Sequence, residues 1–182
     1  NARVITLEKN AGTVVTLPRG VKLTIGYDKF FIADAASTLP FKPPQLHTDR
    51  LALPKQGVVD LPASDSFIGL SLLPRTNIRA DEPMIWKAYL DAEKIVGEMF
   101  LRRRQPGDTF QPAGMHGHTK SLHEFMIDEK IPHYARERLP ILCDREKILW
   151  VCGYRVDERA RVTEATREAL QVMFWKNNLE RD

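Results

Sequence analysis

Short apolar runs that end at proline or glycine dominate the first seventy or so residues, and they constrain the fold more than any other feature. Residues 21–25 alternate strictly between apolar and polar side chains, and Pro18-Arg19-Gly20 suits a turn after the run 14–17. An alternation with period two is typical of a strand with one buried face. Further strands are predicted at 30–32, 50–53, 58–61 and 67–72. The first part of the chain is therefore predicted to be β-structure.

The pattern changes near residue 99. A strand is predicted over 99–104, and a glycine- and proline-rich loop follows over 105–117. A helix is predicted over 121–129, because apolar side chains recur there at helical spacing. That stripe consists of Leu122, Phe125 and Met126. Ser121 and Glu124 have the spacing of a capping box at the start of this helix.

The last third of the chain mixes both patterns. Pro132 can begin a second short helix that runs to Arg138. The runs 141–143 and 148–152 are predicted to form a hairpin. Residues 163–177 are ambiguous, since their first half favours a helix and their last residues favour a strand. Together with the earlier strands, this predicts a β-rich, layered or sandwich-like α+β domain with one or two short helices.

Composition excludes several classes of protein. The chain has 182 residues with 43% hydrophobic side chains, enough for a core without disulfide bonds, and its two cysteines are expected to be free in a reducing cytoplasm. The net charge of only +3 is far from that of strongly basic nucleic-acid binders. No apolar run approaches the roughly 20 residues of a membrane span, and no leader is recognisable, so no membrane partner is expected. Because the chain begins with Asn1, we expect a trimmed piece of a longer protein.

Several catalytic motifs are absent from the sequence. There is no GxxxxGK[ST] or GxGxxG phosphate loop, no GxSxG nucleophile elbow, no CxxC pair and no calcium-loop pattern. No catalytic residue and no metal ligand is therefore assigned, and no cofactor is expected for this part of the protein.

The densest group of unusual residues is the run Arg102-Arg103-Arg104 followed by the glycine-rich loop. Guanidinium groups can grip phosphate oxygens in pairs, and glycines let a backbone approach closely. The alternative is a solvated edge strand that is protected by its charge.

Other polar and aromatic residues have ordinary explanations. His116 and His118 are adjacent in an HxH pattern, but polar loop histidines explain them better than a metal site does. Asp128-Glu129 is expected to be solvated or to cap a helix end. The tryptophans Trp86, Trp150 and Trp175 lie among apolar residues and are predicted to be core.

Read in order, these pieces form a longer motif. It reads Leu101-x-Arg103-x-x-Pro106-Gly107-Asp108-x-Phe110-x-Pro112-x-Gly114-Met115-x-Gly117-x-x-Lys120, then Leu122-x-x-Phe125-x-Ile127-Asp128-x-Lys130-Ile131-Pro132, then Arg136, Leu139-Pro140-Ile141-Leu142 and Ile148-x-Trp150-Val151-x-Gly153-x-Arg155. The motif resembles the C-terminal domain of bacterial tRNA(Ile)-lysidine synthetase over residues 99–170. The upstream Leu17-Pro18-x-Gly20 with Tyr27-Asp28 resembles the segment that precedes that domain.

The resemblance implies a division of labour. The whole enzyme uses ATP to activate C2 of the wobble cytidine in the CAU anticodon of tRNA(Ile), and free lysine then displaces AMP to give lysidine. That chemistry lies in an N-terminal ATP-pyrophosphatase domain with an SGGxDS loop, which this sequence does not contain. ATP and lysine would therefore be bound by that domain, and this chain alone is expected to be inactive. The C-terminal domain holds the tRNA body, especially the acceptor stem, and its fold resembles a domain of the phenylalanyl-tRNA synthetase β-chain.

The resemblance also suggests domain limits and an RNA surface. Residues 1–26 would be a lead-in hairpin from the upstream region, and 27–182 the tRNA-binding domain. Family members often carry paired lysines just before the leucine of the helix, as in KKLK, whereas the run here is Thr119-Lys120-Ser121-Leu122-His123, in which only Lys120 is a certain positive charge. The residues predicted to bind tRNA are Arg102, Arg103, Arg104, Lys120, Lys130, Arg136 and Arg155. Two alternatives stay open: a structural or dimerisation domain without RNA contact, which could form a homodimer, and a stand-alone hydrolase or metal enzyme.

Overall fold

The computed structural model describes residues 14–25, 30–33, 44–78 and 86–176. Within these ranges the protein is built mainly of antiparallel strands with two short α-helices. The elements are β1 (Val14–Thr16), η1 (Pro18–Gly20), β2 (Lys22–Ile25), β3 (Phe30–Ala33), β4 (Arg50–Leu53), β5 (Gly57–Asp60), β6 (Ser66–Pro74), η2 (Arg75–Asn77), β7 (Lys87–Asp91), η3 (Ala92–Lys94), β8 (Met99–Arg102), β9 (Thr109–Phe110), β10 (Lys120–Ser121), α1 (Leu122–Asp128), α2 (His133–Arg136), β11 (Ile141–Cys143), β12 (Ile148–Val151), β13 (Arg155–Val156), η4 (Glu158–Ala160) and β14 (Glu168–Lys176).

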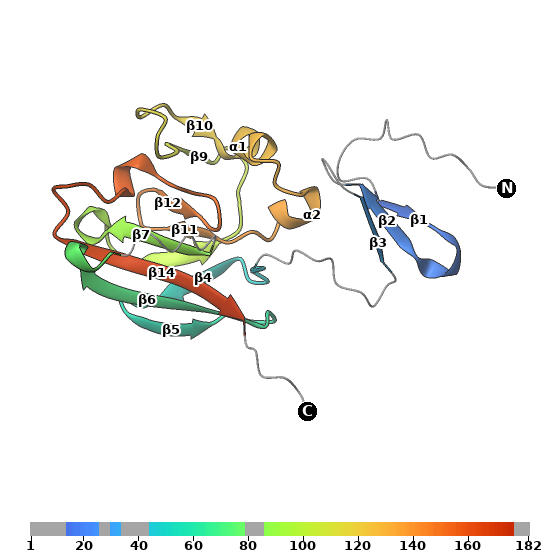
Figure 1. Ribbon diagram of the computed structural model, residues 1–182, viewed down its shortest axis with the longest axis horizontal. Coiled ribbons are helices and arrows are strands. Elements are labelled where there is room, and N and C mark those ends of the chain that lie inside the picture. Colours follow the sequence, from blue (N-terminus) through green and yellow to red (C-terminus); the bar gives the residue numbers. More distant parts are fainter. Residues whose placement is uncertain (1–13, 26–29, 34–43, 79–85, 177–182) are drawn as a thin grey trace.

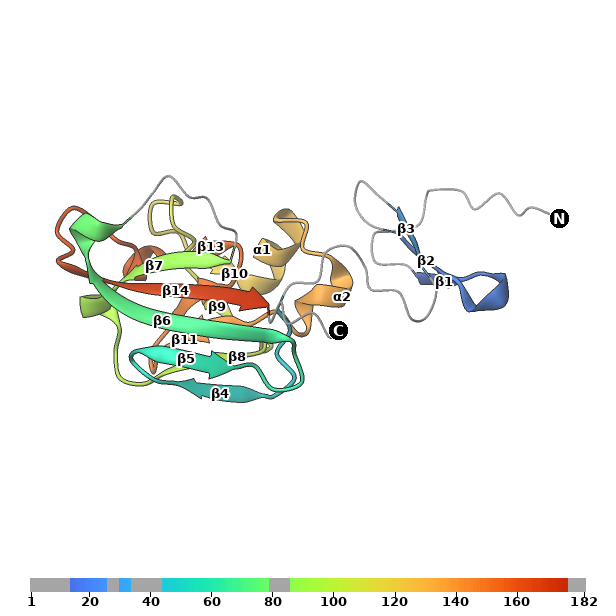
Figure 2. The same cartoon turned by 60° about the horizontal axis from the view of Figure 1, so that its bottom comes forward.

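Two sheets form the main body (Figure 1). One has five strands in the order β13-β12-β11-β8-β4, and the other has four in the order β5-β6-β14-β7. The long strands β6 and β14 pair along their whole length, from Glu168–Pro74 to Lys176–Ser66. Figure 2 shows β14 and β6 running side by side on one side of the body, with β11 and β8 behind them.

The first core lies between the two sheets. Ile68 and Leu70 of β6 and Val172 of β14 point inward and meet Leu101 and Leu142 of the five-stranded sheet. The intervening residues of β6 are less buried, as expected for strands with one covered face. Burial therefore alternates along residues 66–70 of β6.

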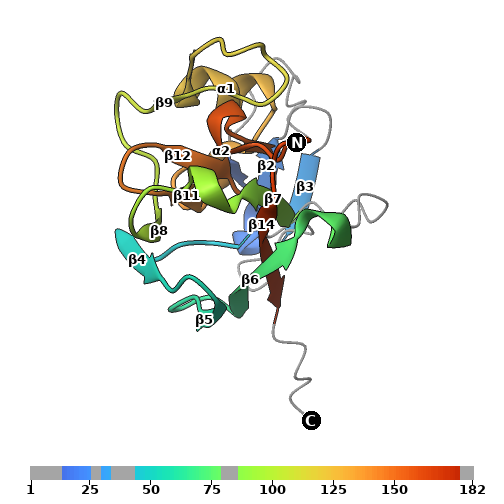
Figure 3. The same cartoon turned by 90° about the vertical axis from the view of Figure 1, so that its left-hand side faces the viewer.

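The second core lies on the opposite face of the five-stranded sheet, where α1 and α2 cover it (Figure 3). Phe125 and Met126 of α1 pack there against Ile141 and Val151. Strands β11 and β12 are therefore buried on both faces, and every residue in them is buried. A strand buried on both faces needs a continuous apolar run, which the sequence has there. The result is three layers: sheet, sheet and helices.

The N-terminal strands make a separate three-stranded sheet in the order β1-β2-β3. Because β3 pairs with β2, this sheet continues past residue 26, where the sequence suggested a boundary. The division into residues 1–26 and 27–182 itself stays a prediction. Within the described ranges, no helix has the length and apolar character that a membrane crossing requires.

The β-rich α+β class, the helix α1 and the hairpin β11–β12 are confirmed. The last segment is a strand, β14, rather than a helix over its first half, because Leu170 and Val172 fill the core between the sheets. The capping box is wrong: Ser121 is the N-cap residue of α1, but its side chain makes no capping hydrogen bond. The sequence also predicts a proline-rich loop over 35–44 and a polar connection over 75–83, of which residues 35–43 and 79–83 lie outside the described residues.

The tryptophans differ from one another. Trp150 is 2% exposed and belongs to the first core, and Trp86 is half-buried against both cores. Trp175 is 36% exposed, so the prediction that it is core was wrong. Its ring lies over Gly69, where an added Cβ would meet the ring at 2.7 Å. Glycine at position 69 therefore lets this tryptophan lie flat on the outer face of the sheet.

Candidate nucleic-acid interface

The turn at residues 103–108 lies against the start of α1. Leu122 donates its backbone N–H to the carbonyl of Asp108 at 2.8 Å. The rings of Phe110 and Phe125 meet edge to face, with centroids 4.8 Å apart. These contacts frame a shallow depression of about 280 Å³, lined by Arg104, Gln105, Pro106, Gly107, Asp108, Ser121, Leu122 and His123. The juxtaposition depends on packing and not on a helix cap.

Arg102 holds the turn at residues 103–108 from its buried side. Its two terminal nitrogens donate to the two carboxylate oxygens of Asp108 at 2.7 and 2.8 Å. Asp108 also accepts the backbone N–H of Gln105 at 2.7 Å. Burial is the largest single influence and lowers the pKa of Arg102, but the hydrogen bonds and charge attraction of Asp108 and Cys143 together outweigh it, so the pKa is raised. The Arg102 side chain is only 15% exposed, so this geometry favours a structural role over phosphate contact.

Arg103 and Arg104 lie beyond the end of β8 and are more exposed. Arg103 pairs with Asp49 and Arg104 with Glu137. Both carboxylates are largely exposed, at 88% and 62% of their side-chain area. Exposed pairs of this kind contribute only about 0–1 kcal/mol. These two arginines can therefore exchange a carboxylate for a phosphate at little cost.

An arginine that the sequence analysis missed completes this surface. Arg138 follows Glu137, the partner of Arg104, and its guanidinium lies 3.5 Å from the ring nitrogen Nδ1 of His47. The segment that carries His47 also carries Asp49, the partner of Arg103, and it is tied to the end of α2 by a backbone hydrogen bond. Arg138 forms no ion pair with any residue that the structure describes. We call Arg103, Arg104 and Arg138 the arginine patch.

The sequence offered a signal for Arg138. It stands two residues after Arg136, in an alternating charge run after a short apolar stretch. Such a run usually indicates a solvated helix face. Arg138 comes near Arg103 and Arg104 because the segment that follows α2 contacts residues 46–49. These two segments are some ninety positions apart in the chain.

Two other predicted residues, Lys120 and Arg155, lie on the helical side of the molecule. Lys120 pairs with Asp128 across α1. Arg155 donates to Glu129 at 3.1 Å and to the carbonyl of Ala113 at 3.4 Å. The pairing of Lys120 is therefore local, and Arg155 fastens the glycine-rich loop to the end of α1.

The remaining two predicted residues, Arg136 and Lys130, differ in their contacts. Arg136 donates its Nε hydrogen to the carbonyl of Ile131 at 2.8 Å, within the turn between the helices. Lys130 is exposed, with a positive φ of 52°, and its ammonium forms no ion pair among the described residues. Lys130 is therefore a cation that can meet a phosphate without first giving up a carboxylate.

The glycine-rich loop is held at its base and open at its tip. Gly114 donates its N–H to Glu158 at 2.9 Å, and this hydrogen bond is the main cause of the lowered pKa of Glu158. Gly114 and Gly117 both have positive φ, and a Cβ at either would meet nothing within 4 Å. Glycine is needed there for the backbone conformation and not for space. Met115 at the tip is 38% exposed.

Metal binding and thiol chemistry depend on His, Cys, Asp and Glu side chains. Among the described residues, no three His, Cys, Asp or Glu side chains converge as a metal site requires. Cys143 and Cys152 are free and buried. Burial raises the pKa of the Cys143 thiol to about 12, so it stays protonated and unreactive at neutral pH.

Comparison with known proteins assigns residues 99–173 to a family. A family model described as the TilS substrate C-terminal domain matches residues 99–173. These residues belong to that family. They supply β8–β14, α1 and α2, whereas β6 and β7, the partners of β14, come before residue 99. The folded unit around the TilS substrate C-terminal domain is therefore larger than the match.

Relatives extend the likeness over most of the chain. The tRNA(Ile)-lysidine synthase of Dehalococcoides mccartyi (strain CBDB1) is 36% identical over 176 residues, which is 94% of this chain and 35% of that protein. The tRNA(Ile)-lysidine synthase of Symbiobacterium thermophilum is 32% identical over 162 residues, which is 86% of this chain and 32% of that protein. The chain thus spans about a third of the length of these relatives.

A solved structure shares the fold. The crystal structure of a TilS C-terminal domain superposes with a TM-score of 0.60 and 24% sequence identity. The match covers 71% of this chain and 97% of that chain. It supports the layered arrangement around the TilS substrate C-terminal domain.

Proposed function

We propose that this chain is the tRNA-holding part of a tRNA(Ile)-lysidine synthase. In this proposal it grips the tRNA body, and the acceptor stem in particular, through the arginine patch, Lys130 and the loop that begins α1. The names of its relatives support the enzyme, and the residue geometry supports the surface. Recognition of an RNA stem by shape requires phosphate and 2′-hydroxyl contacts rather than base-edge contacts, which suits arginine and lysine side chains.

The arginine patch is the observation that carries the proposal. Arg104 lines the depression at the start of α1 and pairs with Glu137, the neighbour of Arg138. Arg138 in turn approaches His47, two residues before Asp49, the partner of Arg103. Two of the three are held only by exposed carboxylates, which phosphate can replace. A guanidinium also matches a phosphate in planar, paired geometry, so three together suit a phosphate ridge.

For the whole enzyme we propose the activity that the relatives' name implies. An ATP-dependent ligase would attach lysine to C2 of the wobble cytidine of tRNA(Ile) with a CAU anticodon. A separate catalytic domain would bind ATP and lysine, and the present chain would supply affinity for the RNA. No step of the chemistry is assigned to the residues described above.

One observation favours a second candidate, a structural or dimerisation domain without RNA contact. Most of the predicted cations already have carboxylate or carbonyl partners. In addition, Val58 and Trp175 on the outer face of the four-stranded sheet are 63% and 36% exposed. If that face pairs with another chain, association should be insensitive to salt, because it buries apolar area.

The two candidates are separated by charge-neutralising variants. We expect Arg103→Ala, Arg104→Ala and Arg138→Ala together to weaken binding of tRNA(Ile) to the 182-residue chain about ten- to a hundredfold at low salt. The slope of log affinity against log salt should also fall by about two to three units, because each phosphate contact on a duplex contributes about 0.9.

A control uses two arginines at the far end of the four-stranded sheet, and it is compared with the double variant Arg103→Ala/Arg104→Ala, which removes the same charge. Arg75→Ala and Arg167→Ala remove exposed side chains near η2 and the start of β14. We expect these variants to leave the affinity and its salt dependence unchanged. Equal loss in both sets would reduce the effect to net charge, and no loss in either would favour the dimerisation domain.

A further inference from the structure

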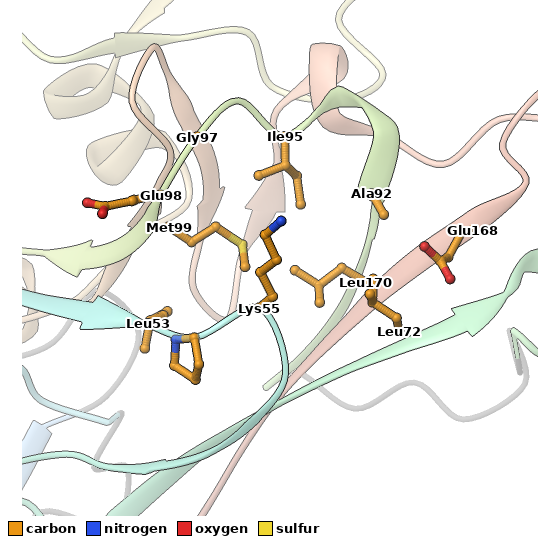
Figure 4. Close-up of a pocket in the computed structure, with 11 residues that line it drawn as sticks. Leu53, Lys55, Leu72, Ala92, Ile95, Gly97, Glu98, Met99, Glu168 and Leu170 are labelled. Carbon is orange, nitrogen blue, oxygen red and sulfur yellow. The ribbon is translucent and has the colours of Figure 1, made fainter.

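A pocket of about 650 Å³ lies at one end of the sandwich (Figure 4), and no residue of the arginine patch lines it. The chain crosses there from β4 in the five-stranded sheet to β5 in the four-stranded sheet through residues 54–56. Leu53 and Met99 line the pocket from one sheet, and Leu72 and Leu170 line it from the other. The pocket is therefore an extension of the first core that opens to solvent.

The walls are made of core residues. Leu53, Met99 and Leu170 are 8%, 6% and 1% exposed, yet each contributes to the pocket lining. The recess is not a closed void, because it opens to solvent beside exposed residues such as Lys55 and Glu168. Its volume falls in the range of roughly 300–1,000 Å³ that is typical of small-molecule sites, which are mostly apolar with a few placed polar groups.

Lys55 is the placed polar group. It sits on the crossing segment, and Figure 4 shows its ammonium directed into the pocket, between Met99 and Leu170. It is the single cation of the lining, and it forms no ion pair with a residue that the structure describes. Lys55 is exposed to solvent, so its ammonium is hydrated and can pair with an anion at the mouth of the pocket, with the small gain of an exposed ion pair.

The two carboxylates of the lining are placed differently. In Figure 4 the carboxylate of Glu98 points away from the pocket, and Glu168 lies on the rim opposite Lys55. Neither forms an ion pair with a described residue. A ligand that carried its charge toward Lys55 would thus keep an apolar body between that charge and Glu168.

We propose that this pocket binds a small amphipathic anion, with an aliphatic or aromatic body and one carboxylate. The body would pack on Leu53, Met99 and Leu170, and the carboxylate would accept a hydrogen bond from Lys55. The site stands apart from RNA binding, because none of the arginine patch lines it and its walls suit no phosphate backbone. It would give the domain a way to respond to a small metabolite.

The test compares two probes with the same tail and opposite charge, octanoate and octylammonium, by isothermal titration calorimetry with the 182-residue chain. We expect saturable one-to-one binding of octanoate and weaker binding of octylammonium. Lys55→Met keeps the aliphatic stem and removes the charge, and it should weaken octanoate binding about fivefold, the worth of one partly exposed ion pair. Lys176→Met, an exposed lysine at the end of β14, is the matched control and should change nothing.

A second pair of variants tests the location. Ala92→Trp should abolish octanoate binding by filling the pocket, and Leu72→Phe should weaken it through a smaller change that the fold tolerates more easily; circular dichroism would confirm that both are folded. Octanoate binding that survives both variants, or that Lys55→Met leaves unchanged, overturns the proposal. So does octylammonium binding as tight as octanoate, which would mean that Glu98 and Glu168 dominate. Absence of saturation below about 1 mM octanoate also overturns it.

Discussion

Arg102 and the arginine patch are neighbours in sequence, but they occupy opposite physical settings. Arg102 is nearly enclosed and makes a two-pronged pair with Asp108, which itself is only 11% exposed. Arg103 and Arg104, one and two residues later, pair with carboxylates that solvent surrounds. The strand β8 ends at Arg102, so the chain leaves the sheet between the two settings.

The difference shows that a run of like charges can serve two purposes. A buried charge pair is expensive to break, because the remaining charge loses its only partner away from water. An exposed pair is cheap to break, since water and salt replace the partner. Arg102 is thus suited to holding the turn at 103–108, and the arginine patch is suited to exchanging partners.

The largest effect should come from breaking the buried pair. Asp108→Ala removes both carboxylate oxygens that accept from Arg102, which keeps the carbonyl of Arg103, and it removes the acceptor of the Gln105 N–H. We expect the free energy of unfolding to fall by about 2–3 kcal/mol, measured by urea denaturation. Asp49→Ala, which breaks the exposed pair of Arg103, should change it by less than about 0.5 kcal/mol.

The same comparison can be made as a double-mutant cycle. Arg102→Ala combined with Asp108→Ala should be little worse than Asp108→Ala alone, because both changes remove one interaction. Equal losses from Asp108→Ala and Asp49→Ala would mean that burial does not separate the two settings, and the comparison would fail.

A smaller effect concerns acid. Asp144 is buried and accepts the N–H of Val96 at 3.0 Å and the ammonium of Lys147 at 2.9 Å. Burial raises the pKa of Asp144, but these hydrogen bonds and those from the backbone N–H groups of Glu146 and Lys147 together outweigh it, so the pKa is lowered. The resulting stability is fully present above the unfolded pKa of about 3.9 and is lost as the pH falls through the folded pKa.

We therefore expect the free energy of unfolding to decline below about pH 4, and Asp144→Asn to lower it by about 1–2 kcal/mol at pH 7 while flattening the decline. Asp91, whose pKa is also lowered, contributes in the same window, so some decline should remain. Urea denaturation between pH 3 and pH 7 would measure this. Asp49→Asn should leave the curve unchanged, and a curve that Asp144→Asn does not alter would contradict the assignment.

Periodicity predicted most of the strands because their burial follows a simple rule. In strands covered on one face, such as β6, buried residues alternate with less buried ones. Strands covered on both faces, such as β12, have a continuous apolar run. β7 was not predicted, because its identity as a strand depends on pairing with β14, some eighty residues later. The same long-range pairing makes residues 168–171 a strand against their local helix propensity.

The candidate site was less predictable than the fold. The sequence located the charge of the turn and the start of α1, and these do lie together. It could not show that Arg102 faces inward, because that depends on where β8 ends. It could not include Arg138 either, because the contact with His47 joins segments far apart in the chain. Partners of a charge are set by tertiary structure, and a pattern of charges alone does not identify them.

The smallest effect gives the sharpest test of the arginine patch, because it predicts a gain. The Glu137 side chain is 62% exposed and forms an ion pair with Arg104 in the free protein. If phosphate replaces this carboxylate, Glu137→Ala removes a competitor and a repulsive charge from the surface. We expect tRNA to bind about two- to fivefold more tightly, corresponding to up to about 1 kcal/mol, with the free energy of unfolding changed by less than about 0.5 kcal/mol.

The control for this gain is Glu146→Ala, an exposed glutamate in the turn between β11 and β12, which changes the net charge equally. Fluorescence anisotropy at two salt concentrations would measure both variants, and the gain from Glu137→Ala should shrink at higher salt as screening increases. Arg104→Ala added to Glu137→Ala should cancel the gain, since no guanidinium remains to be released. An equal gain from Glu146→Ala would attribute the effect to net charge, and a loss from Glu137→Ala would show that the pair positions Arg104 instead of masking it.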